Sequence, residues 1–334
     1  MEQPKNDVLK VKRLHVEFQT SHGMVHAVKD VSLEVKRGRI HALVGESGSG
    51  KSVTSLTIMN LLAGNGKVIS GDVTLNEKSL LKLSGKEKRQ LYGDRIGMIF
   101  QDPTAALDPL FTVEQLLLEG LRKHRRMSKK QAREAALESL RMMNLRDPEE
   151  LMKKKPYELS GGMCQRVMIA IAMSMKPDYL IADEPTTALD VTIQAQILEL
   201  MRELKEKENK SLMLITHDMG VVAEMADDVM VMYAGKEMEY GDVRSIFKDP
   251  LHPYTRGLLK SIPRLDQSSD DPLFNIPGSV PDLSEMPKGC RFCTRCPEAD
   301  KRCREQEPGL YDVNGRQVRC WKYAPEGGQD DVRG

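Results

Sequence analysis

An eight-residue loop, Gly45-Glu-Ser-Gly-Ser-Gly50-Lys51-Ser52, lies between two segments of different periodicity. The apolar run Ile40–Val44 before it predicts a buried strand, and Lys51–Leu62 after it predicts a helix. Glycines at this spacing let the backbone curl until successive N–H groups face one point, where the start of the helix adds a partial positive charge. The pattern predicts a phosphate-binding loop in an α/β fold; a Gly/Ser-rich connector without a ligand is the alternative interpretation.

The side chains of this loop suit a nucleotide with its metal ion. Lys51 would reach the β- and γ-phosphate oxygens, and the hydroxyl of Ser52 would bind Mg²⁺. The residues predicted to contact the nucleotide are Gly45, Ser47, Gly48, Ser49, Gly50, Lys51, Ser52 and Val53.

Two adjacent carboxylates, Asp183 and Glu184, follow the apolar run Tyr179–Ala182. Carboxylates at the end of a buried strand are costly unless they serve a cation or a proton transfer. We therefore expect Asp183 to hold Mg²⁺ and Glu184 to polarise an attacking water. Taken alone, the pair is also compatible with a solvated strand end.

Strand and helix patterns alternate as far as about residue 247, which predicts an α/β core. The predicted strands are Leu9–Phe18, Ala27–Val35, Ile40–Val44, Asp94–Phe100, Tyr179–Ala182, Ser211–Thr216 and Asp228–Met232. The predicted helices are Lys51–Leu62, Ser128–Asn144, Gln165–Met175, Ile193–Glu208 and Val221–Ala226. A Pro-rich stretch, Pro263–Pro287, and a Cys-rich segment follow as a separate small module, with Gly327–Gly334 as a frayed tail.

Charge and hydropathy narrow the classes of partner. The 50 Lys and Arg residues nearly balance 49 Asp and Glu residues, which argues against nucleic acid as the main partner. No apolar run reaches the roughly 18 residues that span a bilayer; the nearest candidate is Val167–Met175. The start of the chain, Met1–Asp7, is charged and lacks the apolar core of a signal peptide, so we expect a cytoplasmic location.

The segment Leu159-Ser160-Gly161-Gly162-Met163 resembles the signature sequence of ABC-type ATPases, and it lies upstream of the paired carboxylates as in that family. The resemblance implies a P-loop (RecA-like) core with a helical subdomain. It also implies that Ser160, Gly161 and Gly162 bind the γ-phosphate of an ATP held by an opposite subunit. A helix start capped by Ser160 is compatible with this role.

Further motifs of the family occur in the expected order. Gln101 corresponds to the Q-loop glutamine, which senses Mg²⁺ and the attacking water, and His217 corresponds to the switch histidine. Ala188-Leu189-Asp190 corresponds to the D-loop, whose Asp190 is expected near the nucleotide. Glu184, His217 and Gln101 are thereby the expected catalytic residues, while Ser52, Gln101 and Asp183 are the expected Mg²⁺ ligands.

Two positions depart from the family pattern. Met163 stands where the signature usually ends in Gln, although Ser160 and Gly162 keep the phosphate-binding groups. The aromatic residue that stacks on adenine in the family aligns with His22, and Phe18 is a nearby substitute.

Other segments resemble the dipeptide and oligopeptide importer branch of the family. They are Asp102–Pro109, Met163–Met168, His252-Pro-Tyr-Thr255 and Ile276–Pro281. The implied domains are the ATPase core with its N-terminal β subdomain (1–100 and 165–247), the helical subdomain (101–164) and the extension (248–334).

The resemblance also implies partners and a location. The expected partners are a second, non-identical ATPase subunit, two transmembrane permease subunits and, through these, an external peptide-binding protein. The chain would lie at the cytoplasmic face of the inner membrane and power the uptake of dipeptides or oligopeptides, with a nickel complex as the alternative cargo. The rival is a soluble ABC ATPase acting in DNA repair or on ribosomes, but such proteins typically carry two cassettes, a coiled-coil insertion or a basic arm.

Five of the six cysteines lie in the extension, whereas Cys164 stands alone. The spacing Cys290-x₂-Cys293-x₂-Cys296 resembles the start of a ferredoxin motif, and a zinc site or free thiols are also open. The importer family's pattern of Gly-Cys-x-Phe-x₂-Arg-Cys-Pro with two later cysteines implies Cys290, Cys296, Cys303 and Cys320 as ligands and leaves Cys293 out. Irregular separations favour a structural 4Fe–4S cluster over zinc, and an electron-transfer role is the less favoured alternative.

Overall fold

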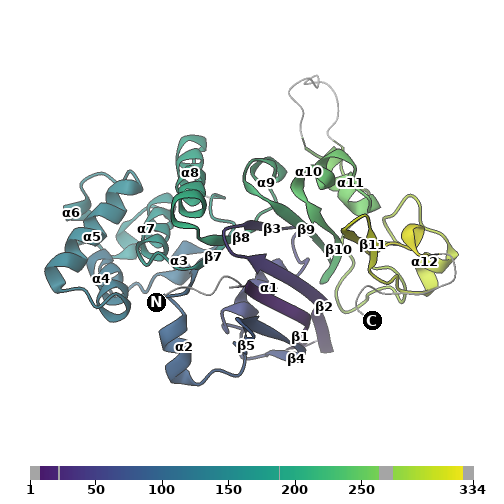
Figure 1. Ribbon diagram of the computed structural model, residues 1–334, viewed down its shortest axis with the longest axis horizontal. Coiled ribbons are helices and arrows are strands. Elements are labelled where there is room, and N and C mark those ends of the chain that lie inside the picture. Colours follow the sequence, from purple (N-terminus) through teal and green to yellow (C-terminus); the bar gives the residue numbers. More distant parts are fainter. Residues whose placement is uncertain (1–7, 22, 188, 263–273, 326–334) are drawn as a thin grey trace. The chain divides into compact units, whose positions relative to one another are not determined.

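The computed structural model describes residues 8–21, 23–187, 189–262 and 274–325 (Figure 1). The chain forms two compact units. The first comprises Met1–Leu9, Val35–Ile40 and Leu75–Ile215, and the second comprises Lys10–Glu34, His41–Thr74 and Thr216–Gly334. The family-based division at residues 101, 165 and 248 remains a prediction.

Parallel strands form the centre of the first unit. Strands β8 (Ser211–Ile215), β7 (Tyr179–Asp183) and β6 (Ile96–Ile99) follow one another in that order across the sheet. Every residue of the three strands is buried, as expected for a parallel sheet covered on both faces. The carboxyl end of β7 therefore delivers Asp183 to one edge of the sheet.

The other elements of the first unit are one short strand and a series of helices. In chain order they are β5 (Lys78–Ser79), α2 (Gly85–Leu91), α3 (Pro103–Ala106), α4 (Val113–His124), α5 (Lys129–Met142), α6 (Pro148–Leu151), η1 (Pro156–Glu158), α7 (Gly161–Ser174) and α8 (Val191–Glu208). Capping boxes start α4 at Thr112 and α5 at Ser128. The helix predicted from Ser128 is thus confirmed.

The second unit holds two sheets. In one sheet, β2 (Gly23–Lys36), β1 (Val8–Thr20) and β4 (Gly66–Leu75) are neighbours in that order. In the other, the order is β3 (Ile40–Val44), β9 (Asp228–Tyr233), β10 (Lys236–Asp242), β12 (Arg316–Val318) and β11 (Tyr311–Val313). The helices of this unit are α1 (Lys51–Ile58), α9 (Met219–Met225), α10 (Val243–Lys248), α11 (Pro253–Lys260), α12 (Lys301–Glu305) and η2 (Trp321–Tyr323).

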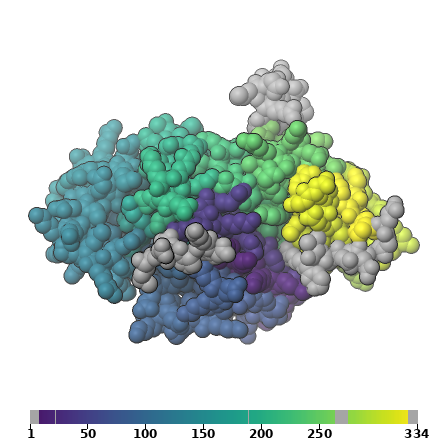
Figure 2. Space-filling model, in the orientation of Figure 1, coloured from purple at the N-terminus to yellow at the C-terminus, as the bar shows by residue number. Residues whose placement is uncertain are grey.

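The C-terminal residues continue the sheet of the second unit. Strand β12 pairs antiparallel with β10, with Val318 opposite Glu239. Figure 2 shows the last described residues, in yellow, against the green residues of this unit. The buried rings of Tyr233, Tyr254 and Phe292 meet with centroids 4.7 to 5.3 Å apart. The extension and β9 therefore share one hydrophobic core.

No helix among the described residues has the length and the apolar run needed to cross a membrane.

Candidate active site

The predicted phosphate-binding loop joins β3 to α1 in the second unit. Gly45, Gly48 and Gly50 have positive φ angles of 149°, 76° and 96°. A Cβ atom on Gly45 would lie 2.1 Å from the backbone oxygen of Met232, and one on Gly50 would lie 2.7 Å from that of Ala27. The loop therefore curls close to neighbouring backbone, which only glycine permits at these positions.

Lys51 is the first residue of α1, and only 7% of it is exposed. Its Nζ atom donates to the backbone oxygens of Gly45 (2.7 Å) and Glu46 (2.9 Å) and to Ser49 Oγ (3.2 Å). The ammonium group thus lies over the loop on which the sequence predicts the phosphates. Ser52 and Val53 follow in the first turn and are half-buried.

The structure also defines the surroundings of His217 in the second unit. His217 is exposed and directly precedes Asp218, the N-cap of α9. The Asp218 carboxylate accepts from the N–H groups of Gly220 (2.8 Å) and Val221 (3.2 Å), and its own N–H donates to Thr216 Oγ1 (3.0 Å). The capped helix start fixes the backbone on which His217 stands.

In the first unit, two predicted catalytic side chains meet at the end of β7. Asp183 ends this strand and is 3% exposed, while Glu184 turns out of it with a φ of 46°. Gln101 Nε2 donates to Glu184 Oε2 at 3.3 Å, and Thr187 Oγ1 donates to the same oxygen at 3.1 Å. The structure thereby joins Gln101 and Glu184, which are far apart in the sequence.

The signature segment starts α7 in the first unit. Ser160 is the N-cap, and its hydroxyl accepts from the N–H of Met163 at 3.4 Å. Ser160 and Gly161 are exposed, and a Cβ on Gly161 would meet nothing within 4 Å. The start of α7 is accordingly open to a ligand.

Sequence reasoning missed the role of Gln165 on the same helix. This buried side chain donates through Nε2 to the backbone oxygen of Pro185 at 2.8 Å, so it ties α7 to the residue after Glu184. A polar residue within the apolar face of the predicted helix was the available signal.

The remaining predicted positions are Asp190, His22, Ala188 and Phe18. Asp190 is the N-cap of α8 and accepts from the N–H of Ile193 at 3.0 Å. His22 and Ala188 lie outside the described residues. The ring of Phe18 packs so close to Gly66 that a Cβ there would approach it to 2.7 Å.

Family comparisons identify this set of motifs. The ABC transporter family matches residues 28–187, and the family described as "Oligopeptide/dipeptide transporter, C-terminal region" matches residues 238–303. The chain is 48% identical to the oligopeptide transport ATP-binding protein AppD of Bacillus subtilis over 96% of this chain and 98% of the relative. It is 51% identical to the dipeptide transport ATP-binding protein DppD of the same organism over 94% of each chain.

The chain belongs to the ABC transporter family. A solved relative, the ATP-binding cassette MJ0796 bound to ADP and Pi, superposes with a TM-score of 0.64 at 31% identity, over 71% of this chain and 99% of that one. These findings confirm the predicted P-loop ABC ATPase fold. They identify the chain as the ATP-hydrolysing subunit of a membrane transporter, which implies membrane permease partners, and the soluble rival is not favoured.

The ABC ATPase also contains a group of cysteines in its extension. A cavity of about 150 Å³ is lined by Cys290, Cys293, Cys296, Cys303 and Cys320, together with residues that include His252 and Trp321. All these cysteines are free thiols. Burial raises the pKa of Cys290 to about 12 and also raises the pKa values of the other four cysteines. Cys290 and Cys293 are buried and the other three are half-buried, so five potential thiolate ligands surround one hollow.

The spacing of the sulfur atoms bears on which group would fit. Tetrahedral zinc with Zn–S bonds of about 2.3 Å places its sulfurs roughly 3.8 Å apart. Among the described residues, no three cysteine sulfurs lie within 4.8 Å of one another. The cavity therefore suits a larger group better than a single zinc ion. Cys293 lines the same cavity, so the lining alone does not separate it from the four predicted ligands.

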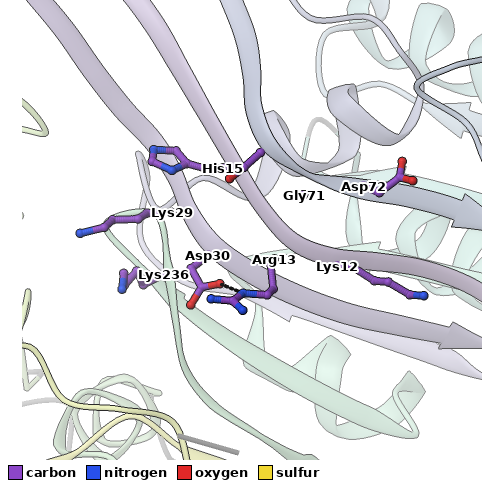
Figure 3. Close-up of a pocket in the computed structure, with 9 residues that line it drawn as sticks. Lys12, Arg13, His15, Lys29, Asp30, Gly71, Asp72 and Lys236 are labelled. Carbon is purple, nitrogen blue, oxygen red and sulfur yellow. Dashed lines mark hydrogen bonds and ion pairs between the residues drawn. The ribbon is translucent and has the colours of Figure 1, made fainter. Parts of the chain in front are cut away.

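A second cavity, of about 700 Å³, lies between β1, β2 and β4 in the second unit (Figure 3). Its lining is mainly basic, although Arg13 pairs with Asp30 at 3.2 Å. The residues around it are Lys12, Arg13, His15, Lys29, Asp30, Ser70, Gly71, Asp72 and Lys236. No predicted nucleotide-binding residue lines it, so it is distinct from the candidate active site.

Proposed function

We propose that this ATPase powers the uptake of dipeptides or oligopeptides as a subunit of an ABC importer. Support comes from the relatives, which are named oligopeptide or dipeptide transport ATP-binding proteins and align over nearly the whole chain. The match of residues 238–303 to the oligopeptide/dipeptide C-terminal region adds a branch-specific feature. Hydrolysis itself is assigned to Glu184, on the strength of the Gln101–Glu184 hydrogen bond at the end of a buried strand.

The proposed catalytic unit is a head-to-tail dimer. Each ATP would lie between the loop Gly45–Val53 of one subunit and Ser160, Gly161 and Gly162 of the other, with Asp190 nearby. Ser52, Gln101 and Asp183 present the oxygen ligands that Mg²⁺ prefers, and the ion would offset charge on the phosphate oxygens.

Each remaining side chain has a proposed step. Lys51 would hold the β- and γ-phosphates once its ammonium exchanges loop oxygens for phosphate oxygens. Glu184 would accept a proton from the attacking water, while Gln101, already bonded to it, would orient that water. His217 would contact the γ-phosphate from the start of α9. Loss of the bridging phosphate would then let the two subunits separate.

The variant Glu184→Gln tests the catalytic assignment. Removal of a general base is expected to slow hydrolysis by on the order of 10²- to 10⁴-fold. ATP binding should persist, and ATP-bound dimers should accumulate in gel filtration. Glu134→Gln, at an exposed position of α5, is the matched control and should hydrolyse ATP normally. Normal hydrolysis by Glu184→Gln would exclude this residue as the base.

The permease subunits are proposed to dock on the helical part of the first unit. A groove of about 820 Å³ there is lined by residues that include Phe111, Leu118 and Arg122. Phe111 and the neighbouring Leu110 are 45% and 75% exposed. The proposed complex also contains a second, non-identical ATPase subunit and an external peptide-binding protein, and it places this chain peripherally at the cytoplasmic face of the inner membrane. Co-purification of permeases that is lost in Phe111→Asp would support it, whereas ribosomes or DNA in their place would contradict it.

The cysteines of the extension are proposed to hold a structural 4Fe–4S cluster through Cys290, Cys296, Cys303 and Cys320. Support comes from the position of all four cysteines on the wall of the same 150 Å³ cavity. Anaerobically purified protein should be brown and should bleach with dithionite. Cys296→Ser should lose the colour and Cys293→Ser should keep it; a colourless protein with stoichiometric zinc would refute the cluster.

A further inference from the structure

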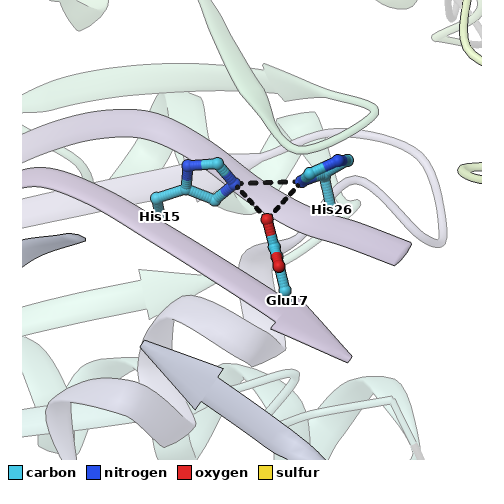
Figure 4. A group of neighbouring side chains, drawn as sticks. All are labelled: His15, Glu17 and His26. Atoms are coloured by element: carbon cyan, nitrogen blue, oxygen red, sulfur yellow. Dashed lines mark hydrogen bonds and ion pairs between the residues drawn. The ribbon is translucent and has the colours of Figure 1, made fainter. Parts of the chain in front are cut away.

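Three side chains with metal-binding atoms meet on the hairpin of β1 and β2, outside every nucleotide motif (Figure 4). His15 and Glu17 are two positions apart on β1, and His26 lies on β2. His15 Nε2 lies 3.0 Å from His26 Nδ1, and both nitrogens approach Glu17 Oε1, at 3.3 Å and 2.8 Å. All three pairs of atoms are thus within contact distance.

Hydrogen bonds alone cannot satisfy the two imidazole nitrogens and the carboxylate oxygen at the same time. A neutral imidazole carries one N–H, which points in one direction, and the carboxylate oxygen only accepts. If both facing nitrogens carry protons to bond Glu17, the two N–H groups oppose each other across 3.0 Å. If only one is protonated, the lone pair of the other faces the carboxylate oxygen. A cation at the centre would accept electron density from all three atoms at once.

We propose that His15, Glu17 and His26 bind a divalent transition-metal ion such as Zn²⁺. A tetrahedral ion with bonds of about 2.0–2.1 Å separates its ligand atoms by roughly 3.3 Å, close to the spacings of this triangle. The side chains are 21%, 15% and 47% exposed, so an ion can enter from solvent and keep water as its fourth ligand. Bound there, the ion joins β1 to β2 and stabilises the hairpin.

The charges around the site are mixed. Burial lowers the pKa of His15, the carboxylate of Glu17 opposes this effect, and the nearby His26, Lys29 and Arg291 add to the lowering. Glu307 partly offsets the positive charge because it pairs with Lys29 at 3.3 Å.

Titration of the nucleotide-free, full-length protein with Co²⁺ tests this site separately from the cysteines. Imidazole and carboxylate ligands give d–d absorption without the thiolate charge-transfer band that the cysteines would add. Wild type and Glu34→Gln, a carboxylate change at an exposed position of β2, should show the thiolate-free species. Glu17→Gln and His26→Asn should lose it.

Thermal melting with and without Zn²⁺ gives a second readout. Zn²⁺ should raise the melting temperature of wild type and Glu34→Gln more than that of Glu17→Gln, while metal-free melting confirms that each variant is folded. Equal Co²⁺ spectra and equal Zn²⁺ shifts in wild type and Glu17→Gln would overturn the proposal.

An independent observation concerns Glu46, the second residue of the phosphate-binding loop. The guanidinium of Arg295 donates to both of its carboxylate oxygens, at 2.6 and 3.1 Å. The N–H of Glu46 donates to the hydroxyl of Tyr254 at 2.9 Å. Both partners belong to the extension, and all three residues lie in the second unit. The extension thus holds this loop through side chain and backbone.

The arginine is rigidly placed. Its side chain is 4% exposed, its guanidinium lies 5.7 Å from the ring centre of Tyr233, and it also donates to the backbone oxygens of Ile276 (3.2 Å) and Pro277 (3.0 Å). A two-pronged pair at a buried arginine is among the stronger charge-assisted contacts. If Arg295 moved, Glu46 would move with it. The loop backbone that Lys51 contacts would then shift as well.

We infer that Arg295 is a positioning residue for the phosphate-binding loop, an inference that rests on the proposed role of this loop in ATP binding. Its loss is expected to raise the KM for ATP about tenfold and to change kcat little, because the catalytic side chains stay intact. The test compares Arg295→Met, Glu46→Gln and the double variant in the assembled ATPase. The double variant should be no worse than Arg295→Met, and Arg295→Lys should recover part of the affinity.

Absorbance of the purified protein checks that Arg295→Met retains any group bound by the cysteines. Additive effects of the two single changes, or a loss of kcat alone, would overturn the inference. Lys51→Ala separates it from the proposed function. If Lys51→Ala still binds ATP, the assignment of this loop to ATP binding is wrong. If Lys51→Ala no longer binds ATP, additive effects of Arg295→Met and Glu46→Gln contradict only the inference about Arg295.

Discussion

At the scale of single residues, the second unit buries charge in matched pairs along β10. Lys236 is 4% exposed and pairs with Glu307, and Glu237 is fully buried and pairs with Arg319. The carboxylate of Glu239 accepts from two backbone N–H groups of the extension. Removing one partner of such a pair leaves an uncompensated buried charge, so these residues bind the extension to the core.

Lys236 makes stability depend on pH in the alkaline range. Burial, assisted by Arg319, lowers its pKa to about 8, against an unperturbed value of 10.5. The unfolded chain therefore binds more protons between pH 8 and 10.5, and the lysine's contribution to the free energy of unfolding rises with pH across that window. Relative to Lys236→Met, wild type should gain about 2 kcal/mol between pH 8 and 10.

Urea unfolding at several pH values measures this difference. Lys301→Met is the control, because Lys301 lies in the same unit, is 87% exposed and pairs with a different carboxylate, Glu305. That variant should keep the pH dependence of wild type. Parallel curves for Lys236→Met and wild type would contradict the prediction.

At the scale of elements, the start of α7 combines two roles in Ser160. As N-cap, its hydroxyl accepts a backbone hydrogen bond; as the signature serine, it is proposed to contact the γ-phosphate of a second subunit's ATP. Both roles depend on the N–H groups and the partial positive charge at a helix start. A structural cap and a ligand site therefore coincide.

The two roles separate by substitution. Ser160→Ala should lower the free energy of unfolding by about 1 kcal/mol, as is typical for loss of an N-cap, and should weaken ATP-driven dimerisation. Ser160→Asn should restore stability, because Asn is a good cap, but should not restore dimerisation. Urea denaturation measures the free energy of unfolding. Gel filtration of each variant combined with Glu184→Gln measures ATP-driven dimerisation. Full dimerisation by both variants would remove Ser160 from the interface.

At the scale of the whole molecule, the extension is part of the fold of the second unit. Phe292 is 1% exposed and packs against Tyr233 and Tyr254. Strand β12 adds a further strand to the sheet that carries β9 and β3. The core of this unit is therefore incomplete without residues that come late in the chain.

Phe292→Ala tests this shared core. Loss of a buried phenylalanine should cost about 3–5 kcal/mol, and the whole second unit should be destabilised together. Phe274→Ala, at a ring that is 43% exposed, is the control and should change stability by less than about 0.5 kcal/mol. Hydrogen exchange that speeds up in the extension while β3 and β9 stay protected would argue for a separate module.

Much of the fold was predictable where the signal is local. The apolar runs of β3, β7 and β8 and the capping pair at Ser128 lie within single segments, so periodicity reveals them. Strand β10 escaped prediction because Lys236, Glu237 and Glu239 interrupt any apolar alternation, although all three are buried. Their charge is tolerated only because partners arrive from the extension.

The sequence by itself determined the family of this protein and predicted the chemistry of its site, since the nucleotide motifs are short stretches whose residue types follow directly from phosphate and Mg²⁺ chemistry. Only the tertiary structure decided which distant residues meet. It joined Gln101 to Glu184, Glu46 to Arg295, and His15 and Glu17 to His26. Such contacts depend on strand order and packing across the chain, and no local pattern of residues encodes them.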